Sequence, residues 1–529
     1  MAEGTVVDSY RIPAGGDPDS SALVTVVDNG SFGKYLVTLP FLNSHESRTL
    51  KLIQDNLRNS IPIEATGSPE QILGNFLWET AGKAGLLEEV ERAHRKFLYF
   101  LTRDFGGFWE IDPLIDDDDL EEISVTRYDK PVRVLHRRFS EYMFIETNIT
   151  YQSEERLQAF IRRLAQFGGT TVSLAQPSLE VTLRGASDRR VSATLGDEIS
   201  RPGSSYSIRK QKEKPLTIVR LTAPEFAKPY HARQPAETPA SYEEAPFHKT
   251  LSALMAAYFW LLLERTTNLL IAGEVSSGKT TLMNAILALM NPKAKIVTAE
   301  DVLEVNLPDH LHWQRMKTRN YRAGLSPTTG RYEYNLSDLL KLALRFSPTI
   351  LSLGEMRGEE SETVATAITL GFSTITTVHA EDAERCIQRI SNPPMRFTSG
   401  HVRDITAIAT MRKVSLPDGR IVRRVVSVDE IRPQGRDGAE ILNIFRYNYA
   451  TDSFAPTTPE EVLEGSFRLK QIGAGFGWTP ENVLDSLTDR AGIIAAAVAN
   501  SEFSPDQLSS LVRKYVSNGF ARNLSRASV

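Results

Sequence analysis

Cysteine is almost absent from the chain, because Cys386 is the only one among its 529 residues. A single thiol can form neither an intramolecular disulfide nor a cysteine-rich metal cluster, which is typical of a protein from a reducing compartment. The residues after Met1 also lack the basic and then apolar pattern of a signal peptide. We therefore expect a cytoplasmic protein.

Long apolar runs are missing as well. The longest one covers residues 251–263 and is bounded by Lys249 and Glu264. A helix needs about 20 apolar residues to span a bilayer, so this run is too short. We predict a buried helix here, so any association with a membrane must be peripheral.

Neither sign of charge dominates the composition. The chain has 61 Lys and Arg against 66 Asp and Glu, a formal net charge of −5, which gives no reason to expect a nucleic acid as partner. A content of 41% hydrophobic and 24% charged residues is that of an ordinary globular protein. Because 529 residues exceed what one core can hold, we expect several domains.

Shifts in composition predict four parts. Residues 1–69 hold short β-like runs broken by turn residues, which predicts a β-rich entry segment. Residues 70–212 mix helical spacing with strands and predict an α+β domain. Residues 213–249 carry six prolines and predict a linker, although a passive surface insertion at 229–247 is an equally good interpretation. Residues 250–529 alternate strands and helices, which predicts an α/β domain with a parallel-rich sheet and a helical tail.

The most specific motif is Gly-Glu-Val-Ser-Ser-Gly-Lys-Thr at residues 273–280. It matches the pattern of a phosphate-binding loop, with Lys279 and Thr280 at its end. An apolar, strand-like run precedes it at 267–272, and good helix formers follow it at 281–290. A loop between strand and helix aims backbone N–H groups and a helix N-terminus at phosphate, so the sequence predicts a nucleotide site.

Polar residues end three further predicted strands. Glu300 follows a strand that starts near Lys295, Glu355 follows an apolar strand at 349–353, and His379 follows a strand at 373–378. The carboxyl ends of strands in a doubly wound sheet open onto the phosphate-binding crevice. A water-activating acid, an acid that orients magnesium through water and a sensor of the γ-phosphate are therefore candidate roles. A solvated acidic turn for residues 300–304 and a structural role for the histidine are the alternatives.

Other conspicuous residues are interpreted as structural. Asp116 to Asp119 are predicted to cap a helix that begins near Leu120, rather than to bind a metal. His310 and His312 have no third ligand nearby, so packing or surface roles are expected. Cys386 is expected in the core or at an interface.

Several strings beyond these motifs point to one family. They are TRDFGG at 102–107 with IDPL at 111–114, QPSLEVTL at 176–183, RVSATLG at 190–196, GSSYSIRK at 203–210 and ISNPPM at 390–395. In this order, and together with the phosphate loop and the acid-tipped strands, they make the chain resemble the type II/IV secretion system ATPase superfamily. The likeness runs from about residue 20 to beyond 500 and is strongest to the archaeal branch, which includes archaellum and type IV pilus motors.

The resemblance implies a RecA-like P-loop ATPase domain in the C-terminal part, with ATP and Mg²⁺ as ligands. The family's Walker A motif falls on residues 273–281, with Lys279 on the β- and γ-phosphates and Thr280 on magnesium. Glu300 matches the catalytic glutamate, Glu355 the Walker B acid that holds magnesium through water, and His379 the His box. Arg209 matches an arginine that reaches the nucleotide from the N-terminal domain. The resemblance thus gives the nucleotide-binding set Gly273, Ser276, Ser277, Gly278, Lys279, Thr280 and Thr281.

Two positions depart from the family pattern. Thr349 stands where an acid commonly follows Arg-Pro, and Phe372 stands where a histidine commonly follows glycine.

Two functions therefore remain open. One is a homohexameric ATP-hydrolysing motor that assembles a type IV pilus, archaellum or secretion pseudopilus through a polytopic membrane platform protein. The other is a nucleotide-gated scaffold with little turnover. The sequence does not say which filament is served, or whether it is assembled or retracted.

Overall fold

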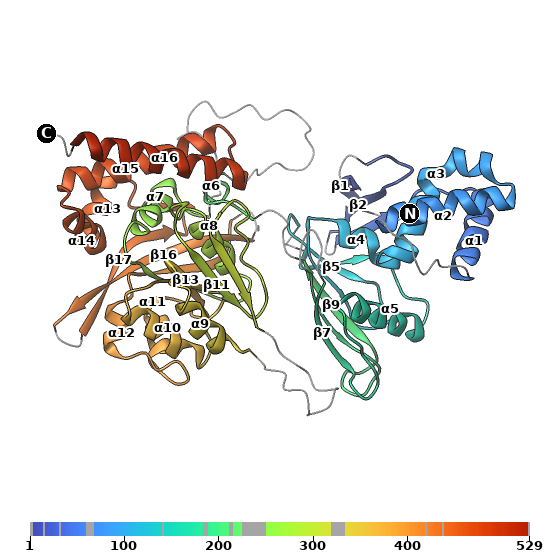
Figure 1. Cartoon of the computed structure of the whole chain (residues 1–529), viewed down its shortest axis with the longest axis horizontal. Coiled ribbons are helices and arrows are strands. Elements are labelled where there is room, and N and C mark those ends of the chain that lie inside the picture. The colour runs from blue at the N-terminus through green and yellow to red at the C-terminus, as the bar shows by residue number, and fades with distance from the viewer. Residues whose placement is uncertain are drawn as a thin grey trace. The chain divides into compact units, whose positions relative to one another are not determined.

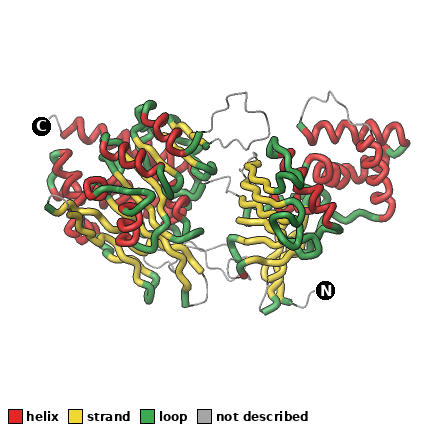
Figure 2. The backbone as a smooth tube through the Cα atoms, turned by 90° about the horizontal axis from the view of Figure 1, so that it is seen from below, coloured by secondary structure: helices red, strands yellow, loops and turns green. Residues whose placement is uncertain are grey.

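The computed structural model describes two compact units, the first up to residue 210 and the second from residue 215 (Figures 1 and 2). The described residues are 4–13, 16–30, 33–59, 68–139, 142–183, 189–210, 215–224, 250–318, 334–417, 421–435 and 438–526. Each unit contains a nine-stranded sheet.

The N-terminal unit is built on a sheet of order β1-β2-β3-β6-β5-β4-β9-β8-β7. Only the β3–β6 pair is parallel. The strands are β1 (Thr5–Ile12), β2 (Ala22–Asp28), β3 (Gly33–Thr38), β4 (Leu120–Val125), β5 (Arg133–His136), β6 (Phe144–Thr147), β7 (Ser178–Leu183), β8 (Arg189–Thr194) and β9 (Ser205–Lys210).

The first three strands do not stand apart as the predicted entry segment over 1–69. Tyr35 of β3 pairs with Thr147 of β6, and Val24 and Tyr35 lie in the same core as residues of the predicted α+β domain. Joining the sheets satisfies the backbone groups that an isolated three-stranded edge would expose. Two pairing strands more than 100 residues apart leave no local signal in the sequence, which is why the segment was predicted to be separate.

Three helices form a second core within this unit, namely α1 (Ser44–Asn59), α2 (Pro69–Ala84) and α3 (Leu87–Leu101). Ser68 begins α2 with a capping box, in which its hydroxyl accepts from the N–H of Gln71. Gly85 ends α2 with a φ of +70°, a conformation that favours glycine. The helix α5 (Glu154–Phe167) packs its apolar face on the sheet (Figure 1).

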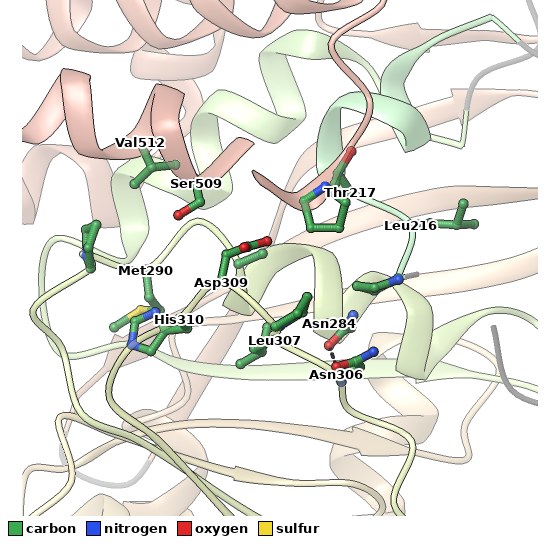
Figure 3. A pocket seen from close by; sticks show the side chains of 15 residues that line it. Leu216, Thr217, Asn284, Met290, Asn306, Leu307, Asp309, His310, Ser509 and Val512 are labelled. Atoms are coloured by element: carbon green, nitrogen blue, oxygen red, sulfur yellow. Dashed lines mark hydrogen bonds between the residues drawn. The ribbon is translucent and has the colours of Figure 1, made fainter. Parts of the chain in front are cut away.

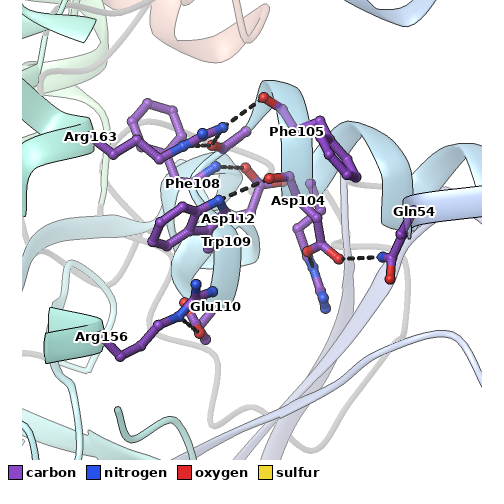
Figure 4. A network of polar contacts seen from close by, with 11 residues as sticks. Gln54, Asp104, Phe105, Phe108, Trp109, Glu110, Asp112, Arg156 and Arg163 are labelled. Carbon is purple, nitrogen blue, oxygen red and sulfur yellow. Dashed lines mark hydrogen bonds and ion pairs between the residues drawn. The ribbon is translucent and has the colours of Figure 1, made fainter. Parts of the chain in front are cut away.

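The string at 102–114 forms the joint between α3 and the sheet (Figure 4). It folds into a π-helix (Thr102–Gly106), a 3₁₀ turn (Trp109–Ile111) and α4 (Asp112–Asp116). Arg163 of α5 donates to the carbonyl of Gly107, and the Trp109 indole donates to the carbonyl of Asp104 at 2.8 Å. These contacts satisfy backbone groups that the irregular turns leave unpaired, so the motif has a structural role within this unit.

The four aspartates at 116–119 end a helix instead of beginning one. The residues after them form strand β4, so the predicted helix near Leu120 is wrong. Asp117 is buried, and one of its oxygens accepts from the hydroxyls of Tyr10 and Tyr35 at 2.7 and 2.6 Å. These tyrosines belong to β1 and β3. The Asp117 carboxylate therefore accepts hydrogen bonds from distant strands, and it does not cap a helix.

The C-terminal unit has a sheet of order β12-β11-β13-β14-β10-β15-β16-β17-β18. The first six strands in this order, from β12 through β11, β13, β14 and β10 to β15, run parallel. Strands β15, β16, β17 and β18 form an antiparallel meander. Their bounds are β10 (Asn268–Gly273), β11 (Ile296–Glu300), β12 (Trp313–Lys317), β13 (Ile350–Leu353), β14 (Ser373–Val378), β15 (Ala407–Ser415), β16 (Ile421–Gln434), β17 (Gly438–Asn448) and β18 (Ser453–Ala455).

Helices cover both faces of this sheet (Figure 1). One face carries α7 (Ala253–Leu262), α8 (Lys279–Leu287) and the tail, and the other carries α9 (Leu336–Leu344), α10 (Glu360–Thr369), α11 (Ala383–Ser391) and α12 (Ser399–Arg403). Alternate residues of β10 enter the two cores, Ile271 on one side and Leu270 on the other. A parallel-rich sheet between two helical layers confirms the predicted α/β fold of this part.

The longest apolar run becomes α7, all of whose residues are buried, as the sequence predicted. Across the part of the chain that the structure describes, no helix has both the length and the apolar character required to cross a membrane.

The start of the predicted linker at 213–249 belongs to the C-terminal unit. It forms α6 (Ile218–Thr222), and the hydroxyl of Thr217 donates to the carbonyl of Phe503. Residues 225–249, with the insertion considered at 229–247, lie outside the described residues. The tail comprises α13 (Pro459–Gly465), α14 (Phe467–Phe476), α15 (Pro480–Ala499) and α16 (Pro505–Arg526).

Candidate nucleotide site

The loop at 273–280 joins the central strand β10 to α8, so strand, loop and helix follow one another as the sequence predicted. Gly273 and Gly278 have φ values of +154° and +98°. A Cβ on Gly273 would lie 2.5 Å from the carbonyl oxygen of Met411 and 2.6 Å from the Ser277 hydroxyl. Only glycine fits this turn. Ser277 is buried and its hydroxyl donates to the carbonyl of Glu274 at 2.9 Å, which closes the loop around the start of α8.

Lys279 lies inside this loop, with 8% of its surface exposed. Its ammonium donates to the carbonyl of Glu274 at 2.8 Å and lies 3.3 Å from Nδ1 of His379. Burial lowers the pKa of Lys279, and the nearby carboxylates of Glu355 and Glu304 act in the opposite direction. The sequence-predicted lysine and histidine, 100 residues apart, therefore meet at the loop.

His379 connects the lysine to the acid at the end of β13. Its Nε2 lies 2.9 Å from Oε1 of Glu355. A neutral ring lets Nδ1 accept from Lys279, whereas Oε1 of Glu355 accepts no hydrogen bond within the described residues. Burial lowers the pKa of His379, and the charge of Lys279 lowers it further, which favours the neutral form. Lys279 at the start of α8, His379 after β14 and Glu355 after β13 thus lie next to one another as one polar group.

Glu300 ends β11 and is 2% exposed. Its Oε1 accepts from the backbone N–H groups of Glu304 and Val305, both at 2.8 Å. Its Oε2 lies 3.8 Å from Nε of Arg315 and makes no hydrogen bond within the described part of the chain. Burial raises the pKa of Glu300 to about 7. A buried carboxyl with one oxygen held and the other available has the properties of a general base.

The two acids follow neighbouring strands of the sheet. Residues Ala299 and Leu353 pair in the parallel register, so Glu300 and Glu355 emerge at the same edge of the sheet. A Cβ on Gly354 would lie 3.3 Å from Cγ of Glu300, so glycine leaves room for the buried carboxyl. Arg357 lies 3.6 Å from Oε2 of Glu355 and also pairs with Asp301. The positions predicted from strand ends therefore converge as expected.

The remaining loop residues suit phosphate and magnesium. Thr280 and Thr281 lie half-buried in the first turn of α8, where backbone N–H groups and the helix dipole favour an anion. The Thr280 hydroxyl and the Glu355 carboxylate are hard oxygen ligands of the kind that Mg²⁺ takes together with phosphate and water. No cluster of three or more His, Cys, Asp or Glu that could hold a metal by itself occurs in the described residues. The Thr280 hydroxyl and the Glu355 carboxylate therefore suit a magnesium ion that is also bound by the phosphates of a nucleotide.

Arg209 belongs to the N-terminal unit and is not among the residues that converge at the loop. It lies on β9, its side chain is 64% exposed, and its Nε is 3.4 Å from Oε2 of Glu122. The exposure leaves the guanidinium accessible to a ligand. Its action on a nucleotide bound to the other unit remains a proposal.

The two departures from the family pattern lie at the other edge of the sheet. Thr349 precedes β13, where its hydroxyl accepts from the N–H of Lys295 and its own N–H donates to the Lys295 carbonyl. Phe372 precedes β14 and packs against the core beneath the sheet. Both residues lie where strands begin, whereas the phosphate loop lies where they end, so neither touches the site.

Two contacts around the site had no signal in the sequence. Arg423 of β16 donates from Nε to the carbonyl of Ser276 at 3.0 Å. Asn284 of α8 accepts from the N–H of Asn306 at 3.0 Å, which ties the helix to the segment after Glu300. This contact borders a pocket between α8, residues 306–310 and α16 (Figure 3), whose lining includes no residue of the phosphate loop. Such partners depend on long-range packing, and no spacing rule could have found them.

Fold and site together define a P-loop nucleotide-binding protein. The family model described as "Type II/IV secretion system protein" matches residues 247–412, which contain the loop, Glu300, Glu355 and His379. The chain belongs to the type II/IV secretion system ATPase superfamily. The predicted resemblance, including its archaeal relatives, is confirmed.

Three relatives illustrate the match. Uncharacterized protein MJ0900 of Methanocaldococcus jannaschii is 28% identical over 513 residues, which are 92% of this chain and 85% of the relative. Uncharacterized protein MJ1287 of the same organism is 35% identical over 46% of this chain and 86% of its own length. The type IV secretion system protein VirB11 of Brucella suis is 29% identical over 53% of this chain and 74% of its own.

Proposed function

We propose that this protein is a Mg²⁺-dependent ATP hydrolase that works as a homohexameric motor at the cytoplasmic face of the membrane. It drives assembly of a type IV pilus, archaellum or secretion pseudopilus through a polytopic membrane platform protein. The observation that carries the proposal is the convergence of Lys279, His379, Glu355 and Glu300 at one edge of the parallel sheet. Family membership supports the nucleotide, and the name of the VirB11 relative supports a role in a secretion system.

The residues divide the work of phosphoryl transfer between them. Lys279 and the N–H groups at the start of α8 neutralise charge on the β- and γ-phosphates. Thr280, and Glu355 through water, would hold magnesium, which would add to the charge neutralisation. Glu300 takes the proton of the attacking water, and a pKa of about 7 lets it accept a proton near neutral pH. His379 is in contact with both Lys279 and Glu355, so it can report the state of the γ-phosphate to β14.

Replacing Arg209 tests the contribution of the N-terminal unit. We expect Arg209→Ala to lower the rate of ATP hydrolysis by about 10²- to 10³-fold while ATP affinity falls much less, because an arginine near the γ-phosphate acts mainly in the transition state. Lysine should rescue the rate poorly, since it lacks the planar fork. Steady-state phosphate release measures the effect, and mixed rings of wild-type and variant subunits show whether the residue acts on a neighbour. If the rate of ATP hydrolysis is unchanged in Arg209→Ala, another arginine must act near the γ-phosphate, and Arg190 is the next candidate.

Co-purification tests the proposed partner. A motor for an extracellular filament must transmit force across a membrane, and an integral platform protein with cytoplasmic loops can receive it. We expect the tagged chain, recovered from detergent-solubilised membranes of its own cells, to bring down a polytopic protein whose yield depends on the nucleotide supplied. Recovery of nucleic acid, without any membrane protein under ATP, ADP or nucleotide-free conditions, would contradict the filament-motor function.

A further inference from the structure

The hairpin formed by β15 and β16 extends beyond the central strand on the side of the phosphate loop. Strand β15 runs parallel to β10, and their last paired residues are Met411 and Gly273. From there β15 continues to Ser415, and β16 returns from Ile421 alongside it. The end of the hairpin therefore lies next to residues 274–278.

One side chain of this hairpin contacts the loop directly. Arg423 donates from Nε to the carbonyl of Ser276, a residue with a φ of +59°. A Cβ on Gly278 would lie 3.4 Å from Cδ of Arg423 and 3.1 Å from Cε of Met411. The hairpin thus packs on the loop, with the ends of Met411 and Arg423 against Gly278. The Arg423 guanidinium is fixed at the middle of the loop.

Among the described residues 411–417 and 421–426 of the hairpin end, the charged side chains are all basic, and Asp418 lies in the connection outside those residues. In the antiparallel register Lys413 faces Arg423, and Arg412 faces Arg424. Arg424 is buried and paired with Asp452, and Arg412 donates to the carbonyl of Glu381, two residues after His379. Lys413 is exposed and shares a face of the hairpin with Arg423. Like charges directly opposite each other destabilise a sheet, and a bound anion would offset this repulsion.

We propose that Arg423 and Lys413 form a second, outer arm of the phosphate site. Arg423 is a positioning residue that holds the loop through the Ser276 carbonyl, and the paired cations add to the affinity for the phosphates of ATP and ADP. The hairpin thereby closes the side of the site opposite to β13, from which Glu355 comes. This inference rests on the proposed nucleotide site and adds two residues to it.

The test compares one substitution at three places in the full-length chain. Methionine keeps the aliphatic stem of a basic residue and removes its charge and its donors. We expect Arg423→Met to raise the Kd for ATP and ADP about tenfold and Lys413→Met about threefold, with Arg423→Lys close to wild type. Lys341→Met on α9 is the control, since it removes an exposed lysine of the same unit at a distant place, and should leave Kd unchanged. Titration calorimetry measures Kd, and thermal unfolding checks that each variant is folded.

The outcomes separate this proposal from the one it rests on. Wild-type Kd values for Arg423→Met and Lys413→Met, alongside weak binding by Lys279→Ala, would overturn the outer arm and leave the nucleotide site intact. Failure of the wild-type chain itself to bind ATP or ADP would overturn both. If Arg423→Met does not fold, Lys413→Met decides, because an exposed side chain is replaced there without disturbing the core. Equal losses in Lys413→Met and Lys341→Met would also count against the proposal.

Discussion

Glu300→Gln is expected to lower the kcat of ATP hydrolysis by about 10²- to 10⁴-fold, the range that a positioned general base contributes, while the Kd for ATP changes little. The amide keeps an oxygen to accept from the N–H groups of Glu304 and Val305, so the local structure survives. It cannot accept the proton of the attacking water. Single-turnover hydrolysis and ATP titration on the same protein measure the two quantities. A wild-type rate in the variant would move the role to Glu304 or Glu355.

The same variant has a second signature in stability. The pKa of Glu300 lies at about 7 in the folded chain, above its ordinary 4.5, so the fold favours the protonated carboxyl. The stability that the residue contributes is present below pH 4.5 and is lost as the pH rises through about 7. Glutamine has no charge to bury. We therefore expect the variant to gain up to about 3 kcal/mol in free energy of unfolding over wild type between pH 4.5 and pH 8, measured with urea at both values. A gain that is independent of pH would contradict burial as the cause of the raised pKa.

Lys279→Ala is expected to weaken ATP binding by at least about 100-fold, because it removes the one charge placed inside the phosphate loop. The loop should keep its shape, since the Ser277 hydroxyl still closes it onto Glu274. Titration with ATP and with ADP measures the loss, and Lys341→Ala is the matched control for removing a lysine. Equal affinity in wild type and Lys279→Ala would exclude this loop as the phosphate site.

Much of the site could be predicted because its rules are local. The loop at 273–280 carries its own spacing, and Glu300, Glu355 and His379 each stand at or just after the end of a buried strand. In a parallel sheet, strand ends meet at one edge, so local patterns were enough to bring these residues together. The resemblance to the family added Arg209 and the ring, and their place in the mechanism stays a prediction.

What could not be predicted depends on pairing between distant segments. Tyr35 of the first strands pairs with a strand that lies more than 100 residues later in the sequence. Asp117 does not cap a helix but accepts hydrogen bonds from two tyrosines. Arg423 reaches the phosphate loop only because the register of β15 on β10 carries the hairpin past Gly273. Local propensity and spacing contain none of this information, since each contact depends on tertiary packing.

The most direct test of the central claim is steady-state phosphate release from the purified full-length chain with ATP, with and without Mg²⁺. The account predicts release that requires Mg²⁺, rises with pH through about 7 as Glu300 loses its proton, and falls to background in Glu300→Gln and Lys279→Ala. A chain that binds ATP tightly yet releases no phosphate with Mg²⁺ present would contradict the motor and favour the nucleotide-gated scaffold.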